Sequence, residues 1–369
     1  MVFNQFDHEC MARAIALAWQ GRYSTSPNPR VGCVIALHHQ IIAESFHQHK
    51  GGAHAEIRAL SQLPPEQDLR ESTIYVTLEP CSHWGATGPC VEALIKRKIG
   101  RVVVAMLDPN PLVNGRGFEL LKKASIQVDC GLLAQQAREL NRGFLSRIER
   151  HRPFVILKMA MSLDGKIALK NRMSQWITGT IAREDVQRNR AESCAILTGI
   201  GTVQRDDPQL NIRSFPTKRQ PVRIVLDPYL TISPNTKVIQ DSGSPTWLVV
   251  AEDLEIQDMK KTLLPPHVKL IGTKIKDGRI ELVNLMKLLA KLEIGQLYLE
   301  CGPKLAGAFL ERKLVDELHI YQAPLILGKD ALDAFALPEL KQLSAASRWN
   351  RIREENLGSD KKWILRPQE

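Results

Sequence analysis

The sequence predicts two α/β domains, one after the other. The chain has 369 residues, which is enough for two separate hydrophobic cores. Helical and extended stretches alternate from residue 10 to about residue 135, and the alternation restarts at Phe154 after a basic, helical stretch over 135–152. We place the boundary near residue 148, so the expected domains are 1–148 and 149–369.

In the first domain, each expected element follows from its apolar pattern and length. Helices are predicted over 10–18, 55–60 and 91–96. Strands are predicted over 32–37, 73–78 and 101–106, which are short, apolar and rich in β-branched residues. Strands and helices that alternate in this way predict an α/β sandwich.

The second domain contains more of these short apolar stretches. Strands are predicted over 154–160, 195–198, 222–226, 246–250, 268–271, 296–300 and 318–321, with helical stretches between them. This spacing favours a second sheet that is mostly parallel. No internal repeat or low-complexity segment interrupts it.

Charge and composition narrow the classes of partner. The formal net charge of +10 indicates an anionic ligand. The basic residues are spread along the chain and aromatic residues make up only 5%, which favours a small phosphorylated ligand over nucleic acid. Cysteines scattered singly, a polar N-terminus and the absence of a long apolar run predict a cytoplasmic protein without signal peptide or membrane span; a homo-oligomer stays open.

One group of residues carries the first chemical prediction. His54-Ala55-Glu56 is followed 24 residues later by Pro80-Cys81, and then by Cys90. One imidazole and two thiolates can hold Zn²⁺ and leave its fourth position for water, whose pKa the metal lowers to about 7. Glu56 would then carry protons from the water to a departing amine, as in hydrolytic deaminases.

Each of these motifs also has a simpler interpretation when it is taken alone. A lone His-x-Glu usually lies on a solvated helix face, and an isolated Pro-Cys is usually a buried thiol. Their combination favours zinc. The common deaminase signature has two residues between its cysteines, whereas this chain has eight, Ser82 to Pro89. His83 in this insertion is an alternative ligand, which we disfavour because His54, Cys81 and Cys90 already suffice.

Two glycine turns follow predicted strands in the second domain, at 198–202 and 299–307. Gly302 allows a close backbone turn and Pro303 suits the first position of a helix, whose N–H groups can bind phosphate. Two such turns in one sheet favour a dinucleotide, although each alone is often only a connection. Arg183, Arg190 and Arg213 are candidate phosphate forks, or simply solvated side chains.

These motifs resemble the bifunctional deaminase–reductases of bacterial riboflavin biosynthesis. The first domain carries Pro27-Asn28-Pro29-Arg30, His54-Ala55-Glu56, Thr77-Leu78-Glu79-Pro80-Cys81 and Asp108-Pro109-Asn110-Pro111, and the second carries Ser162-Leu163-Asp164-Gly165-Lys166, Ser174-Gln175-Trp176, Asp206-Asp207-Pro208 and Glu300-Cys301-Gly302-Pro303. The resemblance implies a cytidine-deaminase-like domain followed by a dihydrofolate-reductase-like domain. It also implies a diaminopyrimidine substrate with a phosphoribosylamino group, deaminated in the first domain. In the second, NADPH reduces the ribosyl group to ribityl.

The resemblance further assigns roles to residues at matching positions. Asn28, Asp108 and Asn110 are expected to hold the pyrimidine during deamination. For reduction, the expected substrate residues are Lys158, Ser174, Arg190, Leu210, Arg213 and Glu300. The expected NADPH residues are Met161, Trp176, Thr202, Asp206, Gly302, Pro303, Lys304, Leu305, Ala306, Gly307 and Ala308.

Three positions depart from the family pattern. Ala86 and Gly88 stand where the family usually has a basic residue and proline, and Met161 stands where small residues are common. Two other functions fit the sequence less well. A nucleic-acid base deaminase requires a basic, aromatic channel, which is not evident here. A binding protein with structural zinc requires four protein ligands, and only three appear.

Overall fold

The computed structural model describes residues 3–84, 88–111, 113–253 and 264–368. The chain divides into two compact units, Met1–Arg150 and His151–Glu369. In the described ranges, no helix is both long and apolar enough to cross a membrane.

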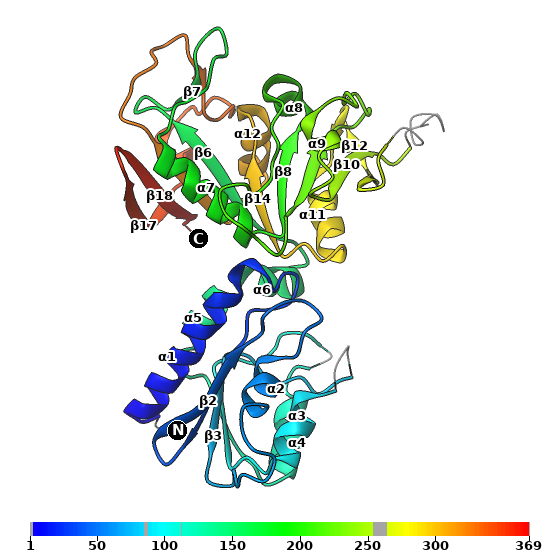
Figure 1. The fold of residues 1–369 in the computed structure, drawn as a ribbon. Helices are drawn as coiled ribbons and strands as arrows, with labels where there is room; N and C mark the ends of the chain where they lie inside the picture. Colours follow the sequence, from blue (N-terminus) through cyan, green and yellow to red (C-terminus); the bar gives the residue numbers. More distant parts are fainter. Residues whose placement is uncertain (1–2, 85–87, 112, 254–263, 369) are drawn as a thin grey trace. The chain divides into compact units, whose positions relative to one another are not determined.

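The first unit is a five-stranded sheet between two layers of helices (Figure 1). Its strands lie in the order β2-β1-β3-β4-β5; β1 is antiparallel to β2 and β3, whereas β3, β4 and β5 are parallel. The strands are β1 (Gly32–Leu37), β2 (Gln40–Phe46), β3 (Thr73–Val76), β4 (Arg101–Val104) and β5 (Gln127–Cys130). The helices are α1 (Gln5–Gln20), α2 (Ala55–Leu60), α3 (Cys90–Lys96), α4 (Arg116–Lys123), α5 (Ala134–Leu140) and α6 (Arg142–Glu149).

Both faces of this sheet are apolar because successive strand residues point to opposite sides. Ile74 and Val76 of β3 pack with α2, α3 and α4, while Tyr75 between them packs with α1 and α5. Three predicted helices and three predicted strands therefore form, with ends shifted by a few residues. The predicted helical stretch over 135–152 is two helices, α5 and α6, separated at Asn141.

The second unit is a nine-stranded sheet in the order β11-β10-β9-β8-β14-β6-β15-β18-β17. From β11 to β15 all neighbours are parallel, and the antiparallel pairings of this sheet are β15 with β18 and β18 with β17, so the predicted, mostly parallel sheet is confirmed. The strands of this sheet are β6 (Phe154–Met161), β8 (Ala195–Gly199), β9 (Val222–Leu226), β10 (Thr246–Ala251), β11 (Val268–Thr273), β14 (Gln296–Glu300), β15 (Glu317–Gln322), β17 (Trp349–Leu357) and β18 (Asp360–Pro367).

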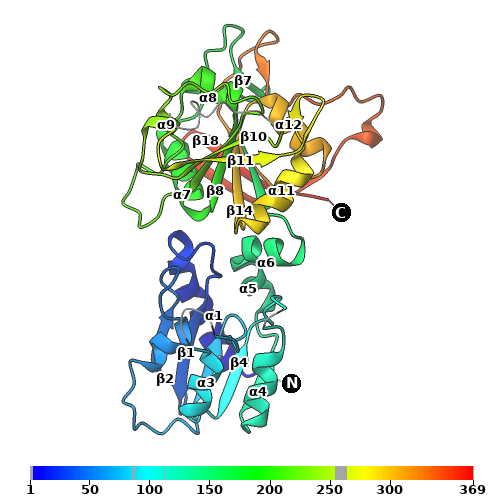
Figure 2. The same ribbon diagram turned by 90° about the vertical axis from the view of Figure 1, so that its right-hand side faces the viewer.

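Helices cover both faces of this second sheet (Figure 2). On one side lie α7 (Thr180–Glu192), α8 (Ile200–Asp206) and α9 (Lys237–Gln240); on the other lie α11 (Leu282–Lys291) and α12 (Pro303–Glu311). Two small ladders, β7 (Lys166–Ala168) with β16 (Leu332–Asp333) and β12 (Ile275–Lys276) with β13 (Arg279–Ile280), complete the unit. Because β6, β8 and β14 are parallel neighbours, their carboxyl ends lie together, where α/β sheets bind ligands.

Candidate active sites

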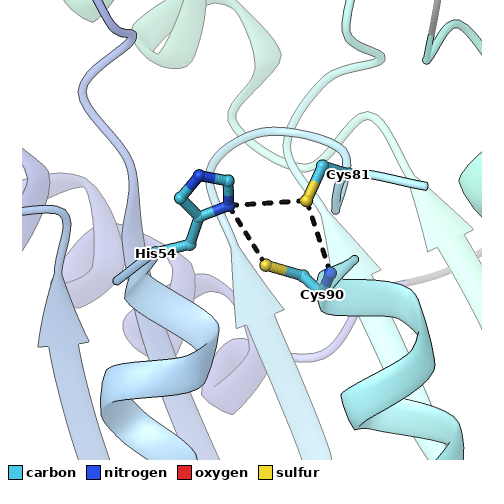
Figure 3. A group of neighbouring side chains, drawn as sticks. All are labelled: His54, Cys81 and Cys90. Carbon is cyan, nitrogen blue, oxygen red and sulfur yellow. Dashed lines mark hydrogen bonds between the residues drawn. The ribbon is translucent and has the colours of Figure 1, made fainter. Parts of the chain in front are cut away.

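The first candidate site is a cluster of the three predicted metal ligands, shown in Figure 3. His54 is the N-cap of α2, Cys81 follows β3, and Cys90 is the first residue of α3. Their ligand atoms all lie within 4.8 Å of one another. Nδ1 of His54 lies 3.2 Å from Sγ of Cys90 and 3.4 Å from Sγ of Cys81. His83 is exposed and is not part of the cluster.

The surroundings of the cluster favour negative charge on the sulfur of Cys81. The Cys90 thiol and backbone N–H both point to Sγ of Cys81, and these hydrogen bonds, together with His54, lower the pKa of Cys81. The hydrogen bond with Cys81 in turn raises the pKa of His54 to about 8. Zinc requires thiolates and a neutral imidazole, so binding the metal would release protons from this cluster.

Glu56 lies one residue into α2, beside the metal cluster. Its side chain is buried, and among the described residues Oε2 has no hydrogen-bond partner. Burial raises the pKa of this carboxyl group. A buried polar atom without a partner costs free energy, so the site fits a ligand or water that completes it.

The three predicted pyrimidine residues lie on two loops. Nδ2 of Asn28 lies 3.2 Å from Nε2 of His47, a buried histidine whose ring packs edge-on against His54 at 5.6 Å between centroids. Asp108 is buried and accepts a hydrogen bond of 2.8 Å from the backbone N–H of Asn110. Burial, with a smaller contribution from the charge of Glu79, raises the pKa of Asp108 to about 6.

Glu79 is a residue of this site to which the sequence analysis gave no role. Its buried carboxylate accepts hydrogen bonds from the backbone N–H groups of Asp108, Gly115 and Gly117, at 3.2, 3.0 and 3.1 Å. It therefore ties the end of β3, which presents Cys81, to the loop that carries Asp108. Glu79 stands in the quoted Leu-Glu-Pro-Cys motif, but its partners lie 29 to 38 residues away and no local pattern identifies them.

Asn141 has a comparable role in the loop of Asn28. Its side chain accepts from the Arg30 backbone N–H at 2.8 Å and donates to the Arg30 carbonyl at 2.9 Å. Ala86 lies outside the described residues, so the predicted departure there has no structural account. Gly88 is described, and a Cβ at that position would lie 3.5 Å from the Trp84 ring.

The second candidate site begins at two helix N-termini in the other unit. Strand β14 leads through the N-cap Gly302 into α12, with Pro303 in its first turn, and β8 leads through Gly199 into α8. The two turns face each other, because a Cβ on Gly302 would lie 4.0 Å from Oγ1 of Thr202 and one on Gly199 would lie 3.5 Å from Leu305. The predicted glycine turns are thus brought together, and the missing side chains leave backbone N–H groups accessible to a phosphate.

The remaining predicted cofactor residues occupy varied positions. Met161 ends β6, and Asp206 ends α8 with its pKa raised by burial. Trp176 is 65% exposed, and the Arg183 guanidinium stacks 4.6 Å from its ring centroid. Arg183 was also a candidate to bind phosphate. Its guanidinium donates a hydrogen bond of 2.6 Å to the nearby Thr178 carbonyl, so part of it is already engaged by the protein. Within α12, Lys304 is exposed and Ala308 half-buried; Ala306 packs into the core, and Gly307 lies against the Ala336 backbone.

The predicted substrate residues form a charged cluster. Arg190 of α7 pairs with Glu300 at the end of β14 through two hydrogen bonds, of 2.6 and 2.9 Å. Lys158 of β6 is the register partner of Glu300 in the neighbouring strand. Leu210 is buried, whereas Ser174 lies half-buried in the loop before α7 without a recorded side-chain contact to this cluster.

Burial and the neighbouring charges shift the pKa values of the side chains in this cluster. Burial would raise the pKa of Glu300, but the charges of Arg190 and Lys158 outweigh it and the pKa lies below its usual range. Burial lowers the pKa of Lys158, against the effect of Glu300. Burial and the like charge of Arg190 lower the pKa of Arg213. Three basic side chains, Arg190, Arg213 and Lys158, thus interact with one carboxylate, and this basic environment suits a phosphorylated ligand.

Comparisons with known proteins match both units. Residues 4–106 match the family described as cytidine and deoxycytidylate deaminase zinc-binding region, and residues 153–360 match the RibD C-terminal domain. The riboflavin biosynthesis protein RibD of Escherichia coli is 42% identical to this chain, covering 96% of it and 97% of the relative. RibD of Haemophilus influenzae is 41% identical, covering 99% and 98%.

Solved structures give the same result. Acinetobacter baumannii RibD superposes with a TM-score of 0.90 at 38% identity, covering 99% of each chain. A deaminase/reductase of Thermotoga maritima superposes with a TM-score of 0.86 at 34% identity, covering 98% of this chain and 99% of the other.

A zinc-binding deaminase unit joined to a reductase unit defines the class of protein: a bifunctional enzyme that is both a hydrolase and an NADPH-dependent oxidoreductase. The chain belongs to the RibD family of riboflavin biosynthesis. The predicted family, fold class, two activities and two cofactors, Zn²⁺ and NADPH, are confirmed.

Proposed function

We propose that the enzyme converts diaminohydroxyphosphoribosylaminopyrimidine into 5-amino-6-(5-phosphoribosylamino)uracil by deamination and then reduces the ribosyl group of that product. The name of the Thermotoga maritima relative contains the substrates of these two reactions. We assign deamination to residues 1–148 and reduction to residues 149–369. One observation carries the proposal. Three metal-ligand atoms lie within 4.8 Å of one another beside the buried Glu56, whose Oε2 has no hydrogen-bond partner among the described residues.

In the deaminase site, His54, Cys81 and Cys90 would hold the zinc ion. When bound, zinc supplies a Lewis acid that makes water a nucleophile at neutral pH. Glu56 takes a proton from that water and delivers it to the departing amine. Its position in the first turn of a helix that His54 caps keeps the carboxylate beside the metal ligands.

The pyrimidine would be oriented by the two loops that carry Asn28, Asp108 and Asn110. An amide and a carboxylate present both donors and acceptors, which suits the edge of a pyrimidine ring. Glu79 and Asn141 hold these loops through backbone hydrogen bonds, so the loops are ordered before substrate binds. Such pre-organisation reduces the entropic cost of positioning the ring.

In the reductase site, NADPH would bind at the facing turns of α8 and α12, along residues 302–308 with Met161, Trp176, Thr202 and Asp206. NADPH supplies the hydride. Arg190 and Arg213 are placed to bind the ribose phosphate through planar guanidinium forks. Lys158, Ser174, Leu210 and Glu300 surround the sugar, and the charge of Lys158 stabilises the oxygen of the opened ring.

We further propose a small-molecule substrate, without nucleic acid or membrane partners, and a cytoplasmic location. Membership of the RibD family supports a small-molecule substrate, and cysteines that form no disulfide suit a reducing compartment.

The test uses the full chain loaded with zinc. We expect it to deaminate the free pyrimidine nucleotide, leave RNA unchanged, and then oxidise NADPH with formation of the ribityl product. Arg213→Ala should raise KM for the phosphorylated intermediate about 10- to 150-fold, the range expected for a lost charge-assisted hydrogen bond, without a comparable change in KM for NADPH. Deamination of RNA but not of the nucleotide would refute the proposal.

A further inference from the structure

A fully buried arginine outside both sites connects to the proposed phosphate residues. Arg223 of β9 is 0% exposed, yet the proposed mechanism does not use it. Its guanidinium donates to Oγ1 of Thr246 at 2.9 Å, to Oδ2 of Asp241 at 3.0 Å and to the Ser244 carbonyl at 2.6 Å. A buried charge is tolerated only when it is paired in this way, so Arg223 fixes the position of the Asp241 carboxylate.

Asp241 in turn fixes the side chain of Asn211. The same oxygen, Oδ2 of Asp241, accepts a hydrogen bond of 3.1 Å from Nδ2 of Asn211. Because its nitrogen is directed to Asp241, the orientation of the Asn211 amide is fixed, and its oxygen Oδ1 is directed towards Arg213.

Asn211 contacts both arginines that we assign to the phosphate. Its backbone carbonyl accepts from Nη1 of Arg190 at 3.0 Å, and Oδ1 lies 3.4 Å from Nη1 of Arg213. The two guanidinium groups repel each other, which contributes to the lowered pKa of Arg213. A neutral acceptor between them holds two like charges near one another while leaving other N–H groups of each free for an anion.

The backbone around Asn211 is held on its other side as well. Gln220 accepts from the Ile212 N–H and donates to the Ile212 carbonyl, both at 2.8 Å, and Gln187 accepts from the Arg213 N–H at 3.0 Å. Leu210 has a left-handed backbone, with φ of 49°, which an L-residue adopts only when its surroundings hold it there. This short segment is therefore rigidly placed.

We propose that Asn211 is a positioning residue that sets the spacing of Arg190 and Arg213 for the substrate phosphate, and that the Arg223–Asp241 pair holds Asn211 in place. The inference rests on the proposed function of the reductase unit. It gives Asn211 a role through the two arginines rather than through contact with the reacting atoms.

The test compares reduction of 5-amino-6-(5-phosphoribosylamino)uracil with reduction of its dephosphorylated form by the full, zinc-loaded chain. Asn211→Ala keeps the backbone carbonyl but removes both side-chain contacts. We expect kcat/KM for the phosphorylated substrate to fall about 3- to 10-fold, the range for one lost hydrogen bond, and kcat/KM for the dephosphorylated form to stay unchanged. KM for NADPH and the rate of deamination should also stay unchanged, which shows that the variant is folded.

Two further variants distinguish a wrong role for Asn211 from a wrong phosphate site. Asn350→Ala, at an exposed asparagine of β17, is the matched control and should leave the preference for phosphate intact. Arg213→Ala should reduce that preference more strongly than Asn211→Ala. If Arg213→Ala reduces the preference and Asn211→Ala does not, the role of Asn211 is refuted while the phosphate site stands. If Arg213→Ala has no effect either, the proposed phosphate site fails, and the inference fails with it.

Discussion

Replacing Glu56 with glutamine tests the deaminase mechanism at a single atom. Glu56→Gln keeps the size of the side chain and removes its capacity to carry a proton. Oε2 has no described hydrogen-bond partner, so the substitution breaks no protein contact there. The contact of the carboxylate with its own backbone N–H remains available to an amide oxygen. We therefore expect the fold and the three metal ligands to be preserved.

The expected loss is confined to chemistry. A positioned general acid–base contributes about 10²–10⁴-fold, so kcat for deamination should fall by that factor, or roughly 3–5 kcal/mol of transition-state stabilisation. The assay follows deamination of the pyrimidine nucleotide by mass spectrometry and measures zinc on the same sample. Reduction of the deaminated intermediate with NADPH serves as the internal control. Near wild-type deamination would refute the role of Glu56, and a parallel loss of reduction would refute the independence of the two sites.

Four other substitutions probe the same unit. Cys81→Ser and, in parallel, Cys90→Ser should each lower bound zinc well below one per chain and abolish deamination; stoichiometric zinc in both would disprove the ligand set. Glu79→Gln leaves at least one of the backbone N–H groups of Asp108, Gly115 and Gly117 facing an amide NH₂, so KM for deamination should rise about tenfold with zinc retained. An unchanged KM would mean that the Asp108 loop is held by other contacts. Burial raises the pKa of Asp108 to about 6, so its folded form binds a proton more readily than the unfolded chain and the charged carboxylate opposes folding at neutral pH. Asp108→Asn should therefore raise the unfolding midpoint at pH 7, and calorimetry should show this gain shrinking as pH falls from about 6 towards 4; a gain independent of pH would contradict this account.

The sequence predicts the elements whose pattern is local and apolar. The buried strands β1, β3 and β4 and the parallel strands from β11 to β15 were all predicted, because their sequences are short and mostly apolar. Most of them are covered on both faces, whereas the edge strand β11 is partly exposed. The hairpin of β17 and β18 was not predicted, since β17 is largely exposed and its charged residues give no such run. Strand β2 was missed for a similar reason, because its first residues are exposed.

The same division applies to the sites. His54, Cys81 and Cys90 could be predicted because donor type and order identify a metal site before any fold is known. The roles of Glu79 and Asn211 could not be predicted, because each depends on partners from distant segments. Asn211, for example, forms hydrogen bonds with Arg190 of α7 and with Asp241 in the loop before β10. Chemistry-bearing residues have a signature in the sequence, whereas residues that only orient them become visible in the tertiary structure.

Strand β18 has a consequence for the order in which the reductase unit can assemble during synthesis. Lys362 of this strand pairs at 2.7 Å with the buried carboxylate of Asp185, which also accepts from Tyr321 at 2.6 Å. Asp185 lies on α7, five residues before Arg190. Until residues 360–367 have left the ribosome, the carboxylate lacks its cation and β15 lacks one neighbour. A nascent chain can therefore complete its deaminase unit well before its reductase unit. A proteolytic cut before Asp360 would remove β18, so we expect the reductase activity to be lost while the deaminase activity is kept.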